Sequence, residues 1–537
     1  MKSGRRIFRA FDPKDQPETM TKKLFPMLCL ALSTLLGTAQ KMPVSYDFGE
    51  TYHDRYRYSN LMNIEADGSG GYLLVRAYYQ GLVLRPKGYL IEHYNSELEL
   101  IEEYNYKLRD QEFINGFFKN GQLNLLFLDY NELKGQYEYW VHSSPIIDFN
   151  FNTRILLSIA SDQVQDPVGR NFHNRNFSNG FSTVILFNEE KTGFVISTHH
   201  KKGKSNKHLV HVFDTALNKK FEYDFSEEIE EKNYAFENVA FSRDLQTAYI
   251  VGKAYFKKSR FQVDERRFQY ELVGLTANGH KIQTFADPGK YPESLYPLVL
   301  QDRLVCVGFY ADRKDNRYNG IAYFEMDPQS LALENAKYNP FSQQFMTDKF
   351  GREEDRDIKN LVFKGVERNG NNEIFFNAEE YFVTSGMEVT GTGQRLKVER
   401  FHHNDIVSVK LKADGSMDWA RNINKTEVTR GDGAYASYSS YNKDGKTYFF
   451  ICTAAENPQL INNERLIFRQ GFSRNRNVFM ISLDENGIMD YEKIIDQGEA
   501  RLPLMVSMPL KLQREQNMLF YAKRGGKKQL VKVDFNP

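Results

Sequence analysis

The chain has 537 residues, with 71 lysines and arginines, 70 aspartates and glutamates, and a formal net charge of +1. This balance argues against recognition of a polyanion through overall charge. Only three cysteines occur, which excludes a small fold held together by disulfides. None of the common catalytic or phosphate-binding motifs is present, such as His-Glu-x-x-His, Gly-x-Ser-x-Gly or Gly-x-x-x-x-Gly-Lys.

The N-terminal segment has the pattern of a leader that is removed from the mature protein. Thr21–Lys23 is a short basic stretch, and the apolar run Leu24–Leu36 follows it directly. This run is shorter than the stretch of about 20 residues that a transmembrane helix needs. Small residues at Gly37 and Ala39 then predict cleavage before Gln40.

Because this signal peptide begins just after Met20, we interpret residues 1–19 as an over-extended gene start, so that residues 1–39 are absent from the mature chain. Removal of seven basic and three acidic residues leaves 64 basic and 67 acidic residues, a net charge of −3. We expect residues 40–537 to be exported to a periplasm, a cell surface or the extracellular space. The two cysteines that remain, Cys306 and Cys452, lie in apolar strands of different repeats, and we expect them to be buried thiols.

A recurring hairpin is the clearest pattern in the rest of the chain. An alternating strand runs into an Asx/Gly turn and a second strand follows, most clearly in Asp405–Trp419 and Asn477–Tyr491. Asp-Gly and Asn-Gly provide the positive φ angles that tight hairpins need. Looser copies of the hairpin lie at residues 88–104, 208–225, 270–285 and 320–333. Repetition of one such unit predicts an all-β repeat architecture.

Each unit is interpreted as four strands, a to d, of which strand b is the most apolar. The b strands lie at residues 72–75, 123–127, 192–196, 248–251, 304–307, 373–376, 448–451 and 518–521. The sequence therefore predicts a single β-propeller of four-stranded blades, eight by this count, or seven if one unit is an insertion. The last unit ends before its strand d, and the N-terminal segment Pro43–Phe48 is expected to fill that place and close the ring.

Two segments resemble known propeller sequences. Asn377–Lys425 resembles a blade that is common in uncharacterised exported β-propeller proteins of bacteria. Ser242–Ile250 is similar to the Ser-Pro-Asp-Gly-Lys turn of TolB-like and WD40-like propellers, with departures at Arg243 and Leu245. The resemblance implies the fold and export, and it brings no catalytic residues and no cofactor.

The loops between strands b and c are long, unlike one another and mostly basic. In a four-stranded antiparallel blade these loops share one face with the d–a connections, and variable loops on a rigid scaffold usually carry the binding residues. A face of one charge sign would concentrate ligands of the opposite sign. The candidate binding residues are Lys201, Lys202, Lys204, Lys257, Lys258, Arg260, Lys523 and Lys527.

Two histidine pairs are the only candidates for chemistry. His199 and His200 lie in one b–c segment, and His402 and His403 lie in another together with Arg400. Imidazoles can bind a metal or act as a base, and a guanidinium can hold a carboxylate. However, neighbouring residues of a strand point to opposite sides of the sheet, so one histidine of each pair is expected to be packed inside. We therefore predict neither a metal site nor a cofactor.

These patterns favour an exported, non-enzymatic binding protein that uses its basic b–c face. The expected partners are an acidic polysaccharide or a cell-envelope protein, whereas export disfavours nucleic acid, and we expect a monomer. The alternative is a carbohydrate-active enzyme such as a uronic-acid polysaccharide lyase. That enzyme needs a cation against the carboxylate and a histidine or tyrosine base. Convergence of the two histidine pairs in one site would favour the lyase.

Overall fold

The computed structural model describes residues 44–535, except for several short internal segments. The segments outside the description are 82–84, 109, 168–179, 229–231, 257–267, 286, 301–302, 313–316, 352–357, 390, 392, 432, 462–464 and 471–476. The expected leader therefore lies outside the described residues. Residues 46–533 form one compact unit.

The described strands form eight sheets, one for each repeat unit of the sequence. Five of them consist of four strands in chain order. They are β3 (Ser59–Ala66), β4 (Tyr72–Gln80), β5 (Arg85–Tyr94) and β6 (Leu100–Tyr106); β7 (Glu112–Lys119), β8 (Gln122–Asn131), β9 (Gln136–Pro145) and β10 (Asn152–Ala160); β11 (Phe181–Phe187), β12 (Gly193–Lys202), β13 (Ser205–Asp214) and β14 (Lys219–Asp224); β15 (Lys232–Phe241), β16 (Ala248–Phe256), β17 (Phe268–Thr276) and β18 (Gly279–Thr284); and β19 (Tyr291–Leu300), β20 (Arg303–Ala311), β21 (Gly320–Met326) and β22 (Leu333–Pro340).

The next two sheets keep this plan with additions. The sixth contains β23 (Leu361–Arg368), β24 (Ile374–Val389), β25 (Arg395–Leu411) and β26 (Met417–Thr426), extended by β27 (Val428–Thr429), β30 (Gln459–Ile461) and β31 (Arg465–Arg469). The seventh contains β28 (Ser439–Lys443), β29 (Lys446–Thr453), β32 (Asn477–Leu483) and β33 (Met489–Ile495). Between β22 and β23 lies the helix α2 (Gln343–Phe350), which is capped by the side chain of Ser342 and ends at Gly351 with a φ of 78°.

The last sheet joins the two ends of the chain, as the sequence predicts. It has the order β1 (Ser45–Phe48), β36 (Lys527–Asp534), β35 (Asn517–Arg524) and β34 (Leu510–Leu512), and β2 (Tyr52–His53) also pairs with β36. The backbone N–H of Gly49 donates to the carbonyl of Leu530 at 3.0 Å. The N-terminal strand thus takes the outermost place in the sheet that the C-terminal strands leave incomplete.

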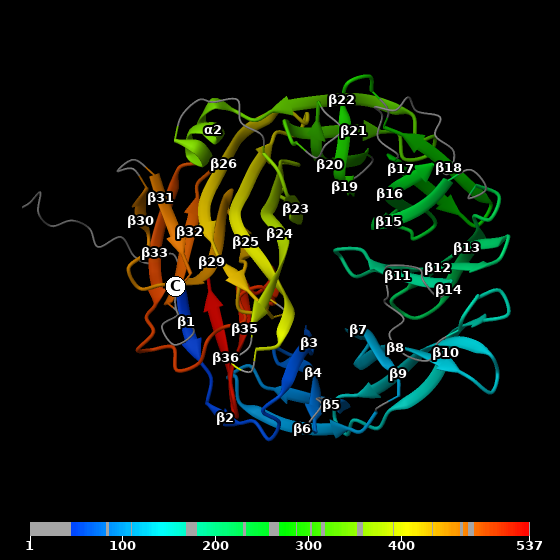
Figure 1. The fold of residues 1–537 in the computed structure, drawn as a ribbon, viewed down its shortest axis with the longest axis horizontal. Helices are drawn as coiled ribbons and strands as arrows, with labels where there is room; N and C mark the ends of the chain where they lie inside the picture. The colour runs from blue at the N-terminus through cyan, green and yellow to red at the C-terminus, as the bar shows by residue number, and fades with distance from the viewer. Residues whose placement is uncertain are drawn as a thin grey trace, which may run out of the picture. The chain divides into compact units, whose positions relative to one another are not determined.

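Within residues 46–533 the sheets follow one another around a ring, from β3–β6 to β35 and β36 (Figure 1). The prediction of a single all-β propeller with four-stranded blades is confirmed. Apolar side chains of neighbouring sheets meet between them: Val195 and Val212 pack with Phe236, Ile250 and Val273. The alternation of the strands thus provides two apolar faces per sheet, one for each neighbour.

Cys306 and Cys452 are buried thiols, as expected. Burial raises the pKa of the Cys306 thiol. No helix within the described residues is long and apolar enough to cross a membrane.

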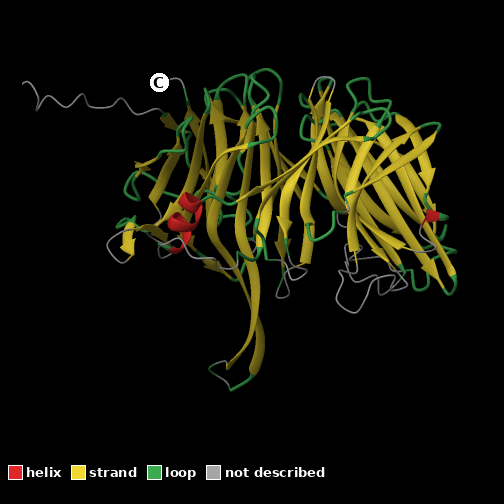
Figure 2. Cartoon of the chain, turned by 90° about the horizontal axis from the view of Figure 1, so that it is seen from above, coloured by secondary structure: helices red, strands yellow, loops and turns green. Residues whose placement is uncertain are grey.

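The hairpin of β24 and β25 is much longer than the others, with 16 and 17 residues in its two strands. Figure 2 shows this hairpin projecting beyond the ends of the neighbouring sheets. We call the projecting part, residues 381–403, the arm.

Candidate functional site

The β12–β13 hairpin carries the first histidine pair and three of the candidate lysines. Ser197, His199 and Lys201 point to one side of the sheet, because they alternate along β12. His200 points to the other side, where it is 3% exposed and its ring lies 5.6 Å from Phe181. The two histidines of this pair therefore have separate surroundings, as strand alternation predicts.

A groove of about 1180 Å³ lies beside this hairpin, between the sheet of β11–β14 and the sheet of β15–β18. The inner strands β11 and β15 form its length, and the β12–β13 hairpin forms its end. Tyr255 of β16, 40% exposed, completes the rim.

The inner end of the groove is formed by a buried, neutral histidine. His208 faces His199 across the hairpin with ring centres 5.3 Å apart, and its Nε2 lies 2.7 Å from the hydroxyl of Ser197. The ring of Phe236 lies 5.2 Å away. Burial lowers the pKa of His208 to about 3, so its imidazole carries no charge at neutral pH. The inner end of the groove is consequently polar and uncharged.

The outer end of the groove is basic. Lys201 and Lys204 are exposed and line the groove, and Lys202 and Lys207 lie on the same hairpin. Lys202 donates to the backbone carbonyl of Asp162 at 3.0 Å. Among the described residues, no carboxylate forms an ion pair with Lys201, Lys204 or Lys207. No carboxylate of the described residues therefore neutralises these charges.

A bulge in β15 sets the orientation of Glu237, the acidic residue that lines the groove. The register of β15 against β16 shifts between Phe236 and Asn238, which turns Glu237 outward. Gly252 is needed opposite the bulge, since a Cβ there would lie 2.3 Å from the carbonyl oxygen of Ala235. Glu237 accepts a hydrogen bond from the Tyr270 hydroxyl at 2.7 Å. The same carboxylate forms an ion pair of 3.3 Å with Lys253, so it does not neutralise the lysines at the outer end of the groove.

The other predicted binding residues have different positions. Lys257, Lys258 and Arg260 lie outside the described residues. Lys527 is exposed beside the turn between β35 and β36. Lys523 corrects the prediction of an exposed basic residue: it is 5% exposed and forms an ion pair with Asp54.

The second histidine pair lies in a different sheet. The ring of His402 stacks on Phe382 at 4.3 Å. His403 places its Nδ1 3.2 Å from the buried carboxylate of Glu379. Figure 1 shows β12 on the right of the ring and β25 on the left, so the two pairs do not converge.

Arg400 is also engaged, through an ion pair of 2.6 Å with Glu388 on the opposite strand of the arm. Within the described ranges, no group of three or more His, Cys, Asp or Glu residues could hold a metal ion. Among these candidates for chemistry, only His199 lies at the groove.

A buried cluster in the sixth sheet escaped the sequence analysis. Lys425 donates to Glu427 at 3.0 Å and lies 3.4 Å from Glu379. Histidine and lysine neighbours lower the pKa of Glu379 to about 2 against the effect of burial. Its members lie in strands β24 to β26 and in the loop that follows them, so neither a motif nor a spacing marked them.

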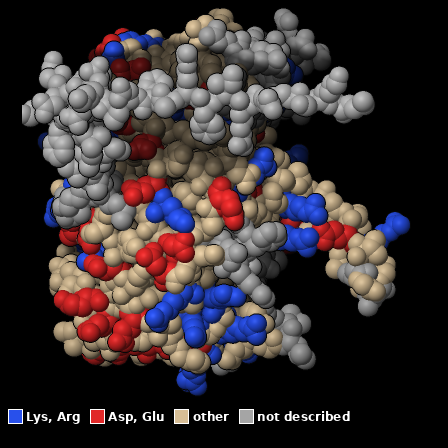
Figure 3. Space-filling model, turned by 90° about the vertical axis from the view of Figure 1, so that its left-hand side faces the viewer, with Lys and Arg blue, Asp and Glu red and all other residues tan. Residues whose placement is uncertain are grey.

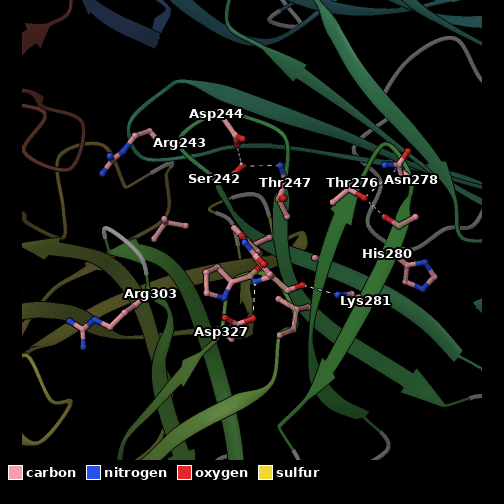
Figure 4. Close-up of a pocket in the computed structure, with 17 residues that line it drawn as sticks. Ser242, Arg243, Asp244, Thr247, Thr276, Asn278, His280, Lys281, Arg303 and Asp327 are labelled. Atoms are coloured by element: carbon pink, nitrogen blue, oxygen red, sulfur yellow. Dashed lines mark hydrogen bonds between the residues drawn. The ribbon is translucent and has the colours of Figure 1, made fainter.

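A second hollow of about 760 Å³ lies at the opposite ends of the strands, among the turns of the fourth and fifth sheets (Figure 4). Its acids are used by their own turns: Asp244 accepts from the hydroxyl of Ser242 at 2.6 Å, and Asp327 accepts from the backbone N–H of Ser330 at 2.6 Å. Lys281 donates to the carbonyl of Gln329 at 2.9 Å. Because local turn geometry explains these contacts, this hollow is the weaker candidate for a binding site.

No protein-family model and no curated protein sequence matches the chain. Among solved structures, the chain is similar to the β-propeller domain of the Trilobed protease from Pyrococcus furiosus, with 9% identity, a TM-score of 0.35, and coverage of 83% of this chain and 98% of that one. Polysaccharide lyase Uly1 matches with 7% identity, a TM-score of 0.37, and coverage of 91% and 100%. A prolyl endopeptidase matches with 9% identity, a TM-score of 0.34 and coverage of 80%, and this chain spans only 46% of its length. At these identities and scores, the comparisons assign neither an activity nor a ligand.

Proposed function

We propose that the protein is an exported, non-enzymatic β-propeller that binds an acidic polysaccharide in the groove beside the β12–β13 hairpin. One observation carries the proposal: Lys201 and Lys204 line this groove without a carboxylate partner among the described residues. Exposed lysines of one sign attract ligands of the opposite sign. Export enters the proposal from the leader sequence alone.

The polar lining supports a sugar as the ligand. Ser182, Asn206 and Asn233 offer hydroxyl and amide groups along the groove, and the half-exposed ring of Tyr255 offers an aromatic surface. Ligand sites typically combine apolar or aromatic surface with a few polar groups that fix the orientation of the ligand. A carboxylate or sulfate on the same sugar would lie at the lysines.

Binding of acidic and neutral polysaccharides to the purified protein tests the proposal. We expect binding to the acidic polymer only, with an affinity that falls between low and high salt, because salt screens exposed charges over about 8 Å at physiological ionic strength. The variant Lys201→Glu/Lys204→Glu should reduce the affinity at least about ten-fold, since repulsion replaces attraction at two positions.

The matched control is Lys219→Glu/Lys220→Glu, which makes the same charge change at the opposite end of the same sheet. Its affinity should stay within about two-fold of the unaltered protein, because screening weakens distant charges. Equal binding of neutral and acidic polymers, or no binding to either, would contradict the proposal and favour a protein partner. Ultraviolet absorbance of an unsaturated uronate product, if it accumulated, would instead identify a lyase.

A further inference from the structure

One strand of the arm, β24, has an exposed edge of the kind that proteins usually protect against pairing with another chain. Strand β23 pairs with β24 only as far as Glu380, and the N–H of Tyr381 donates to the carbonyl of Asn360, so the outer edge of β24 from Phe382 to Val389 has no partner strand among the described residues. This stretch contains a single charged residue, Glu388. Arg400 and Arg430 already hold Glu388, at 2.6 and 2.8 Å.

The other edge of the arm is different. Strand β25 pairs with β27 only at Phe401 and His402, which leaves Arg395–Arg400 as its open edge. That edge carries Arg395, Lys397, Glu399 and Arg400. Charged residues on an edge strand prevent pairing with another chain, whereas an uncharged edge is a template for pairing. Only the β24 edge is therefore open to a further strand. Figure 3 shows the arm at the right, with basic and acidic residues side by side.

Apolar side chains accompany the unprotected edge. Val383, Met387 and Val389 are 45%, 62% and 67% exposed and alternate along one face of β24. A two-stranded hairpin is marginally stable in water, and further strands are needed to stabilise it. An arm of this length with exposed apolar residues thus indicates that another strand covers it.

We propose that this strand is β24 of a second copy of the chain, so that two arms form one continuous sheet. The sequence is self-complementary in antiparallel pairing about Gly386. Val383 then faces Val389 of the partner subunit, and Met387 faces Ser385 of the partner subunit. Glu388 faces Thr384 of the partner subunit, so no like charges oppose one another. A cross-strand pair of apolar residues contributes about 0.2–1 kcal/mol, whereas like charges directly opposite are destabilising.

The pairing is also sterically open at its centre. A Cβ placed on Gly386 would meet no atom within 4 Å, so a side chain can be introduced at this position without a clash on the face of the arm. The interface is isologous, because the same segment is used by both copies. The dimer would replace the monomer that the sequence led us to expect.

Light scattering of the purified protein over a range of concentrations tests the dimer. We expect the mass to rise to that of two chains as the concentration increases, and Met387→Lys to halve it by placing a charge on the edge. Leu396→Lys is the matched control: Leu396 is 51% exposed on the opposite strand of the same arm, and this variant should remain dimeric. A wild-type protein that stays monomeric, or a Met387→Lys variant that still dimerises, overturns the pairing. A monomer would leave an extended segment of another protein as the occupant of the edge.

A disulfide tests the register. Opposed residues of antiparallel strands have Cα atoms about 4.5–5.5 Å apart, within the range that a disulfide bridges. Gly386→Cys should therefore form a cross-linked dimer under mild oxidation. Thr384→Cys should not, because four residues of offset separate the two cysteines by about 13 Å. Efficient cross-linking of Thr384→Cys would overturn this register. The native Cys306 and Cys452 are buried and do not compete.

Discussion

The β12–β13 and β35–β36 hairpins occupy the same position in their sheets, and each carries several lysines. The lysines of the first hairpin are exposed, and Lys201 and Lys204 have no carboxylate partner among the described residues. In the second hairpin, Lys523 and Lys528 are 5% and 0% exposed, whereas Arg524 and Lys527 between them are exposed.

Two carboxylates make the difference: Glu92 in the first sheet, and Asp54 in the segment between β2 and β3. Lys528 donates to Glu92 at 2.7 Å, and Lys523 forms an ion pair with Asp54. Both carboxylates also bind Arg76, which is fully buried and donates to Asp54 at 2.8 Å. We call these five side chains the closure cluster, since they join the first sheet to the last. Whether a lysine of a basic loop can bind a ligand thus depends on carboxylates that are remote in the sequence.

Removal of one charge from the closure cluster has the largest expected effect. Lys528→Ala should lower the free energy of unfolding by about 3–5 kcal/mol, because it removes the cation that pairs with the buried carboxylate of Glu92 and with the carboxylate of Glu103. Lys527→Ala, one residue away on the exposed side, should change the stability by less than about 0.5 kcal/mol. Urea denaturation of the two variants measures the difference. Equal effects of both variants would show that the ion pairs of Lys528 do not contribute to stability as described.

The pH dependence of stability separates the two regions further. Burial lowers the pKa of His200 to about 4 and that of His208 to about 3, from an ordinary value of 6.5. Below pH 6.5 the unfolded chain binds protons that the folded chain does not, so stability falls as the pH decreases towards 4. Each such histidine contributes a slope of about 1.4 kcal/mol per pH unit.

The closure cluster does not change the slope of stability against pH over most of the range between pH 4 and 6.5. The reason is that Arg76 lowers the pKa values of Asp54 and Glu92 against the effect of burial. Unfolding measured between pH 4.5 and 7 in wild type and in His208→Phe tests this difference. In the variant, the slope of stability against pH should be smaller by about the contribution of one histidine. Parallel profiles would mean that His208 is protonated equally in both states.

The smallest expected effect is on the stability of the β12–β13 hairpin. Lys201→Ala/Lys204→Ala should change the free energy of unfolding by less than about 0.5 kcal/mol, since exposed charges without partners contribute little to folding. Thermal unfolding at low and high salt measures it. A loss of more than about 1 kcal/mol would place these lysines in a structural role instead of a binding one.

Local patterns were sufficient to predict the fold. Gly415 and Gly487 have φ angles of 80° and 74° in the Asp-Gly and Asn-Gly turns that marked the two clearest hairpins. The apolar b strands became the buried centres of their sheets, as in Phe449 and Ile451 of β29. The vacant place in the last unit also led to the closing strand, because an open sheet edge needs a partner.

Contacts between remote segments could not be predicted in the same way. Lys523 and Asp54 are 469 residues apart, and nothing near Lys523 indicates that it is buried. The arm was interpreted as a polar b–c loop, because small residues in the middle of its first strand interrupt the apolar alternation and its second strand is rich in charged residues. Tyr234 and Glu237, which line the groove, were not recognised, since β15 follows an acidic connector and contains a bulge that interrupts its alternation.

The closure cluster also sets the order in which the chain can finish folding. The contact between Glu92 and Lys528 spans 436 residues, so it forms only after nearly the whole chain has been synthesised. Until then the first sheet holds Arg76 beside carboxylates that lack their lysines. Bringing such distant segments together is slow, and incompletely folded chains are exposed to aggregation and degradation in the interval. A chain that ends before β36 can never leave this state. Burial of the N-terminal charges is thereby coupled to the presence of the C-terminal strands.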